Sequence, residues 1–116
     1  MSDPLLELRD ALRAFAAERD WDQFHSPRNL ATALAVEAAE LLEPFQWLND
    51  EQSASPSPET RAAIEQEMAD VLLYLVRLAD RLDVDLAAAA RAKIVKNGEK
   101  YPVERARGSS RKYTEI

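Results

Sequence analysis

Two segments of the chain repeat apolar residues with the period of an α-helix, and each carries a pair of carboxylates three residues apart. The pairs are Glu37 with Glu40 and Glu67 with Asp70. Residues three apart share a helix face, and the helical phase places Glu37 and Glu67 on or beside the apolar stripe, where an unpaired carboxylate is costly. Four converging carboxylates would repel each other strongly, so the pattern favours a bound divalent cation.

The two acidic segments also resemble each other. Residues 34–42 and 64–72 match at several positions, which suggests two antiparallel helices that present equivalent acidic faces to one site. The expected apolar stripe of the second segment consists of Ile64, Met68, Val71, Leu75, Leu78 and Leu82. The alternative is that the acids are solvated helix faces, which we accept for Glu43, Glu59 and Glu65 but not for the inward positions.

Length and composition predict one all-α domain. The chain has 116 residues, only 2 glycines and no cysteine, so disulfides and thiolate metal sites are excluded. Its apolar runs are too short to span a bilayer and its N-terminus lacks a signal pattern, so we expect a cytoplasmic protein without a membrane partner.

The charge is distributed unevenly along the chain. Residues 1–90 hold 7 basic and 18 acidic side chains, whereas residues 91–116 hold 8 basic and 3 acidic ones. Such an acidic body argues against a nucleic-acid partner. It suits a metal held by carboxylates, with a polyphosphate that bridges the metal and basic side chains.

Capping signals predict four principal helices. Asp3-Pro4, Ser26-Pro27 and Ser57-Pro58 each read as an N-cap followed by a first-turn proline, and Asp85 as a further N-cap. Asn97-Gly98 reads as a helix stop. We expect a four-helix bundle with helices over residues 4–19, 27–43, 58–81 and 86–96, a polar loop at 49–58, a helical domain over 1–102 and an irregular basic tail over 103–116.

The ligand chemistry narrows the choice of metal. Magnesium prefers all-oxygen sites and keeps water and substrate phosphates as ligands, whereas zinc is disfavoured without cysteine. A di-iron bundle would need Glu-x-x-His motifs, but His25 is the only histidine and lies outside both acidic segments.

Several motifs stand out along the chain. They are WDQFHSPRNL from Trp21, EAAE from Glu37, FQW from Phe45, EMADVLLY from Glu67, the residues Lys93 and Asn97, YP from Tyr101 and SSRKYTE from Ser109. Together these motifs resemble those of the MazG-like, all-α nucleotide pyrophosphohydrolases, and within them the dCTP pyrophosphatase branch. The resemblance covers nearly the whole chain. It departs at Ala and Val residues around Glu37, where relatives carry Gly, and we expect a further difference in the length of the 49–58 loop.

The resemblance implies Mg²⁺-dependent hydrolysis of a nucleoside triphosphate to the monophosphate and pyrophosphate, in a homo-oligomer that is often a tetramer. It implies that Glu37, Glu40, Glu67 and Asp70 bind the metal, and that Lys93, Asn97 and Tyr101 reach the phosphates. The base and sugar pocket would be shaped by Trp21, Phe24, His25, Asn29, Trp47 and Tyr74. Glu40 is the candidate base that activates water, although the sequence leaves this choice among the carboxylates open. The preference for dCTP or a modified dCTP rests on the resemblance alone.

Each of these residues also has a purely structural interpretation. Trp21 and Trp47 could be core or interface aromatics, and His25 could be a surface or capping residue. Lys93 and Asn97 could simply suit a helix C-terminus. The alternative function is a non-catalytic helical module that senses nucleotides or binds a protein partner. Such a module would be free to lose one of the four carboxylates or Lys93, and none is missing here.

Overall fold

The computed structural model describes residues 3–116, and every regular element in this range is helical. The long helices are α1 (Pro4–Glu18), α2 (Pro27–Leu42), α4 (Pro58–Arg81) and α5 (Leu86–Lys100), and the short ones are α3 (Asp50–Ala54) and α6 (Val103–Ala106). Three 3-10 turns accompany them: η1 (Asp22–Phe24), η2 (Glu43–Phe45) and η3 (Tyr113–Glu115). The expected all-α class is confirmed, and the four-helix bundle stays a prediction. Among residues 3–116, no helix is long and apolar enough to cross a membrane.

Contacts divide the chain into two units, the first ending at Val84 and the second running from Asp85 to Ile116. The first contains α1 to α4, and the second contains α5 and α6. The expected functional boundary between residues 102 and 103 stays a prediction.

The helix starts agree with the capping signals. Asp3, Ser26 and Ser57 each accept a hydrogen bond on the side chain from a backbone N–H of the first turn, and a proline follows each of them. These prolines have no N–H to lose at the first helical position, and their fixed φ suits the helix. Asp85 caps α5 in the same way through the backbone N–H of Ala88.

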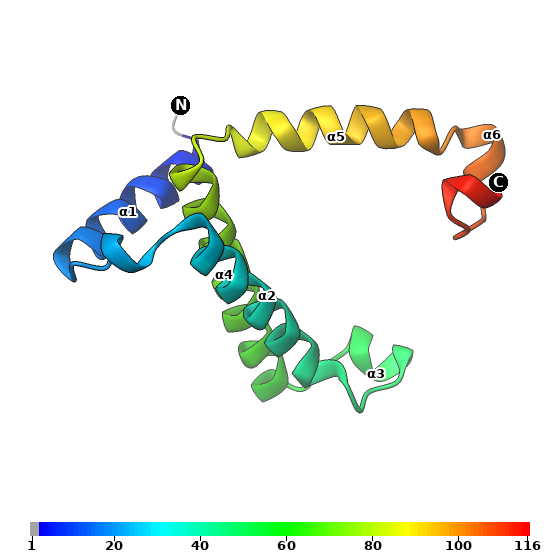
Figure 1. The fold of residues 1–116 in the computed structure, drawn as a ribbon. Helices are drawn as coiled ribbons and strands as arrows, with labels where there is room; N and C mark the ends of the chain where they lie inside the picture. The colour runs from blue at the N-terminus through cyan, green and yellow to red at the C-terminus, as the bar shows by residue number, and fades with distance from the viewer. Residues whose placement is uncertain (1–2) are drawn as a thin grey trace. The chain divides into compact units, whose positions relative to one another are not determined.

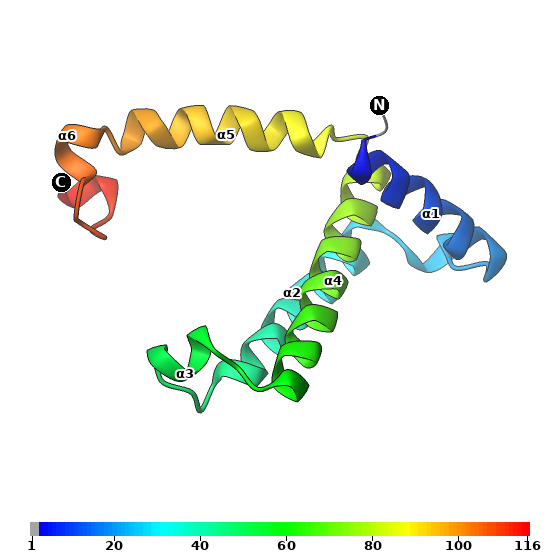
Figure 2. The ribbon, with the colours of Figure 1, turned by 180° about the vertical axis from the view of Figure 1, so that it is seen from behind.

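Helices α2 and α4 form an antiparallel pair and lie side by side along their length (Figure 1). Leu30 on α2 and Ile64 on α4 are buried within the first unit, and Leu30 is only 1% exposed. Helix α1 packs against α4 as well, as the reverse view shows (Figure 2), and buries Ala16. The pair therefore carries the acidic segments on neighbouring helices, as the internal repeat predicted.

The buried face of α4 differs from the expected stripe. Met68 and Leu82 are 56% and 54% exposed, whereas Val76, Arg77 and Ala79 are buried. Because both α1 and α2 pack against α4, its contact face is not one straight stripe. The prediction of one apolar stripe was therefore wrong at Met68 and Leu82.

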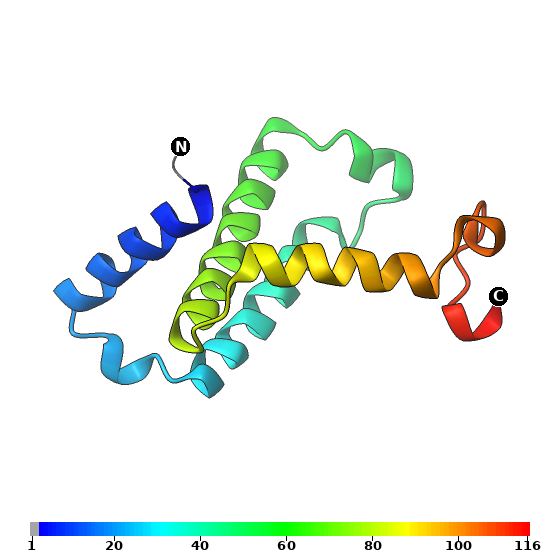
Figure 3. The same cartoon turned by 90° about the horizontal axis from the view of Figure 1, so that it is seen from above.

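The segment predicted as a loop between α2 and α4 contains a helix. Figure 3 shows α3 within this connection. The Asn49 side chain accepts from the backbone N–H of Gln52 at 2.8 Å, and the Gln52 side chain accepts from the backbone N–H of Asn49 at 3.0 Å. This reciprocal capping box explains how five residues hold a helical turn, and it corrects the expectation of an irregular loop.

Helix α5 also continues past its predicted stop. Asn97 and Gly98 lie inside the helix, which ends at Lys100. Tyr101 leaves the helical region, with φ −124° and ψ 65°, because it precedes Pro102. Pro102 then caps α6, and η3 follows, so the part of the chain expected to lack helical structure contains two short helical turns.

Candidate metal site and base pocket

Three carboxylates meet where α2 and α4 pack together. Glu37 from α2 and Glu67 and Asp70 from α4 each offer an oxygen, and these oxygens lie within 4.8 Å of one another. Glu67 and Asp70 share a face because they are three residues apart on one helix. The side-by-side packing of α2 brings Glu37 to that face.

The cluster is poorly satisfied by the protein itself. One carboxylate oxygen of Glu37 and one of Glu67 are buried and have no hydrogen-bond partner. Burial, together with the nearby carboxyl groups of Glu40 and Asp70, raises the pKa of Glu37 to about 7. Buried polar atoms are normally paired, so this donor set fits a hard cation such as Mg²⁺, which binds carboxylate oxygens.

Glu40 lies beside this cluster but outside the group of three. Its carboxylate is close enough to help raise the pKa of Glu37. Glu40 and Glu67 also line a hollow of about 450 Å³ between α2 and α4, together with Glu43, Glu59 and Thr60. Glu40 is therefore placed next to the expected metal ligands, one turn of α2 beyond Glu37.

A mostly apolar pocket of about 380 Å³ adjoins the cluster through Asp70. It brings together three of the residues predicted for the base pocket, which are Trp21, His25 and Tyr74. The other lining residues are Leu8, Ala11, Leu12, Phe15, Leu73 and Arg77. A cavity of this size, with an apolar wall and a few polar groups, has the properties of a small-molecule site.

The α1 wall of this pocket was not predicted. Leu8, Leu12 and Phe15 repeat at helical spacing, which marks them equally well as core residues. Phe15 packs edge-on against Trp21, with ring centroids 5.6 Å apart. The positive φ of Asp20, 55°, turns the chain after α1 and brings Trp21 back toward that helix.

Other predicted pocket residues are not among those that line this cavity. Phe24 is 58% exposed and Trp47 is 86% exposed. The Asn29 side chain donates to the Phe24 carbonyl at 3.0 Å, so it holds η1 against the start of α2. Substrate contacts of these three residues stay predictions.

The residues predicted to reach the phosphates lie in the second unit. Lys93 and Asn97 are one turn apart on α5. Tyr101 packs edge-on against Tyr113 with ring centroids 5.9 Å apart, and the Lys100 ammonium lies 4.9 Å from the centre of the Tyr113 ring. Phosphate binding by Lys93, Asn97 and Tyr101 stays a prediction.

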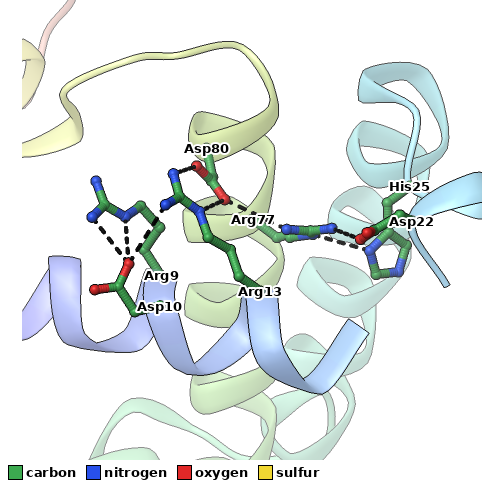
Figure 4. Close-up of polar contacts among 7 residues, drawn as sticks. All are labelled: Arg9, Asp10, Arg13, Asp22, His25, Arg77 and Asp80. Carbon is green, nitrogen blue, oxygen red and sulfur yellow. Dashed lines mark hydrogen bonds and ion pairs between the residues drawn. The ribbon is translucent and has the colours of Figure 1, made fainter. Parts of the chain in front are cut away.

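A buried arginine, which was not predicted from the sequence, lies in the pocket wall. Arg77 donates to His25, Asp22 and Asp80, and Arg13 from α1 reaches Asp80 from the other side (Figure 4). The Arg13 guanidinium is the main reason that the pKa of Asp80 is lowered. This network joins α1, η1 and α4 behind the pocket.

Known proteins resemble this chain over most of its length. The MazG-like family model matches residues 32–116. Human dCTP pyrophosphatase 1 is 51% identical over 98% of this chain and 69% of its own length, and the bovine enzyme is 50% identical over 99% and 70%. The crystal structure of a pyrophosphatase from Archaeoglobus fulgidus superposes with a TM-score of 0.82, at 38% identity, over 88% of this chain and 95% of that one.

Proposed function

The chain belongs to the MazG-like family and is a nucleotide pyrophosphohydrolase, and we propose that it cleaves dCTP or a modified dCTP to the monophosphate and pyrophosphate with Mg²⁺ as its metal. The observation that carries the proposal is the pair of buried, partnerless oxygens of Glu37 and Glu67 next to a base-sized pocket. Asp70 belongs to both features, so a nucleotide in the pocket would have its phosphates near the carboxylates.

The roles proposed for the carboxylates follow from their positions. Glu37, Glu67 and Asp70 would hold the cation, with Glu40 as a further ligand beside them. A bound Mg²⁺ would supply charge neutralisation on the phosphate oxygens. Glu40 is also the proposed base: it lies at the edge of the cluster, outside the group of three, and would accept a proton from the water that attacks the α-phosphorus. Lys93, Asn97 and Tyr101 would contact the phosphates.

The lining of the pocket suits a nucleotide base in general, but it does not by itself select one particular base. Trp21, Tyr74 and the apolar α1 wall offer stacking and packing surface. Stacking tolerates every base, so discrimination requires polar groups that the wrong base would leave unpaired. Phe24, Asn29 and Trp47 are proposed to complete the enclosure of the base and sugar. The choice of dCTP is supported by the substrate named for the curated relatives.

We also propose that the protein works as a homo-oligomer, with a tetramer as the favoured form. Large apolar side chains are exposed on the single chain, including Trp47, Met68, Ile94 and Val95. Exposed apolar surface of this kind is typical of interfaces between subunits.

The metal site is tested by substitution of its carboxylates. Glu67→Gln removes a ligand charge and is expected to lower kcat for pyrophosphate release from dCTP by at least about 10³-fold. The matched control is Glu65→Gln on the same helix, where an exposed carboxylate pairs with Arg61 at 3.5 Å. Exposed pairs contribute little, so this control should keep near-normal activity. Near-normal turnover by both Glu67→Gln and Glu40→Gln would contradict the site assignment, and a wild-type protein with no turnover would favour the non-catalytic module.

A further inference from the structure

Arg77 is a buried cation that has no part in the proposed chemistry. Its side chain is only 6% exposed, on the face of α4 that lines the base pocket. Nε donates to Nδ1 of His25 at 3.1 Å, one Nη donates to Asp22, and the other donates to Asp80 at 3.4 Å (Figure 4). Each of the three guanidinium nitrogens thus donates to a protein group, and these hydrogen bonds hold the Arg77 side chain in place.

The bond to His25 decides which imidazole nitrogen carries the proton. A guanidinium group can only donate, so Nδ1 of His25 must accept and therefore carries no hydrogen. In a neutral imidazole the single N–H is then on Nε2. A cationic ring would instead direct an N–H at the guanidinium.

The surroundings of His25 also favour the uncharged ring. Burial and the nearby Arg77 lower the pKa of His25, and Arg81 adds to this effect, while Asp22 acts in the opposite direction. Among the other charges on the neighbouring elements, Arg13 of α1 is bound to Asp80, and Asp70 of α4 lines the pocket.

We propose that Arg77 is a positioning residue that locks His25 as the neutral Nε2–H tautomer, so that the ring offers the base pocket one uncharged hydrogen-bond donor. The part of this inference that concerns binding of a base by His25 rests on the proposed function. A donor of this kind suits an acceptor on the base, such as a pyrimidine carbonyl oxygen or an unprotonated ring nitrogen. Most of the other lining residues are apolar, so a base without an acceptor there would leave the donor unpaired.

Asp80 and Arg13 hold this arrangement in place from behind. Asp80 accepts from both Arg77 and Arg13, which ties α4 to α1. Asp22 ties Arg77 to η1, three residues before His25. The guanidinium is therefore fixed from two further elements, and its Nε is held toward the imidazole.

The tautomer can be measured directly because His25 is the only histidine of the chain. Long-range ¹H–¹⁵N NMR of the uniformly labelled, nucleotide-free protein distinguishes a protonated ring nitrogen from an unprotonated one. The expected spectrum shows one protonated Nε2 and one unprotonated Nδ1, and it stays unchanged to below the pH at which a free histidine titrates. A protonated Nδ1, or a mixture of tautomers like that of a solvated histidine, would overturn the proposal without any variant.

Substitution separates the hydrogen bond from the charge. In Arg77→Met the fixed tautomer should be replaced by a mixture, and the His25 pKa should rise toward its ordinary value. The control Arg81→Met removes a nearby positive charge without removing the bond, so it should keep the Nε2–H tautomer. Because Arg77→Met removes one of the two arginine partners of Asp80 and leaves only Arg13, the double variant Arg77→Ala/Asp80→Ala removes both groups and provides a second test. Retention of a pure Nε2–H tautomer in either Arg77 variant would contradict the role of Arg77.

Kinetics then tests what the tautomer does for the substrate. At pH 7.5, where the His25 ring is neutral in either tautomer, KM for dCTP in Arg77→Met should be about threefold or more above that of wild type, with kcat changed by less than about twofold. The difference in KM should shrink toward pH 6, because a protonated imidazole again carries a hydrogen on Nε2. Equal effects on kcat and KM at every pH would indicate a structural defect and contradict the proposal. The NMR result does not depend on turnover: the expected tautomer in a protein that releases no pyrophosphate would contradict the proposed function and support the role of Arg77.

Discussion

Glu37 is the carboxylate whose chemistry the fold changes most. Burial raises its pKa to about 7, and the neighbouring carboxyl groups of Glu40 and Asp70 add to this shift. One of its oxygens is buried without a hydrogen-bond partner. A proton and a metal ion therefore compete for the same group in the nucleotide-free protein.

This competition predicts how Mg²⁺ affinity depends on pH. Below about pH 7 the Glu37 carboxyl holds a proton that the cation must displace, so the affinity should fall by about tenfold for each pH unit. Above that pH the carboxylate is already ionised and the affinity should level off. Isothermal titration calorimetry of the wild-type protein with Mg²⁺ between pH 5.5 and pH 8.5 measures this profile.

Glu37→Gln is the control for the pH profile. It should bind Mg²⁺ more weakly at every pH, and its affinity should lose most of the dependence on pH near 7. A wild-type affinity that stays constant from pH 5.5 to pH 8.5 would show that Glu37 does not exchange a proton for the metal.

Some site residues could be predicted from the sequence and others could not. Helical phase alone indicated that Glu37 and Glu67 point inward, because the spacing of apolar residues fixes the orientation of a helix face. Arg77 was not predicted, because its burial depends on Asp22, which lies 55 residues away in the chain. A cation on an apolar stripe is ambiguous until its partners are placed by the tertiary fold.

At the scale of the helices, starts were predicted better than ends. A capping side chain followed by proline fixes a start through local hydrogen bonds, as at Ser26-Pro27 and Ser57-Pro58. The end of α5 was mispredicted at Asn97-Gly98, since glycine is compatible with a helix interior as well as with a helix stop. The stronger constraint was Pro102, which disfavours helical backbone at Tyr101.

The helical state of Gly98 predicts that Gly98→Ala stabilises the protein. Apart from the adjacent backbone of its own helix, a Cβ atom at this position would meet no atom within 4 Å, and alanine inside a helix is favoured over glycine by about 0.5–1 kcal/mol. Urea unfolding followed by circular dichroism would measure the gain. If Gly98 were instead a left-handed helix stop, the same substitution would destabilise the protein.

Gly108→Ala is the matched comparison. Gly108 has a φ of +73°, where a side chain is strained, although the space around it is equally open. This variant should be neutral or destabilising. If both substitutions stabilised the protein, this result would contradict the backbone conformations assigned to Gly98 and Gly108.

At the scale of the whole molecule, much apolar surface is left uncovered by the single chain. Ile94 and Val95 on α5 are 70% and 64% exposed, and Trp47 is 86% exposed. Patches of large apolar side chains are costly to leave in water. This surface is the physical reason to expect subunit association.

Association is testable by size-exclusion chromatography with light scattering. The wild-type protein should have at least twice the mass of one chain at micromolar concentration, and Ile94→Glu should reduce that mass because a charge would be buried in the interface. Ala89→Glu adds the same charge elsewhere on α5 and serves as the control. A monomeric wild-type protein would rule out the proposed oligomer.

The most direct test of the central claim is the identity and rate of the products formed from dCTP. With Mg²⁺, ³¹P NMR should show dCMP and pyrophosphate in equal amounts, and kcat/KM for dCTP should exceed the values for dATP and CTP by at least about tenfold, a difference of ~1.4 kcal/mol in transition-state free energy. Chelation of the metal should abolish the reaction. Release of orthophosphate with dCDP, turnover that survives chelation, or no turnover would contradict the claim that this protein is an Mg²⁺-dependent dCTP pyrophosphohydrolase.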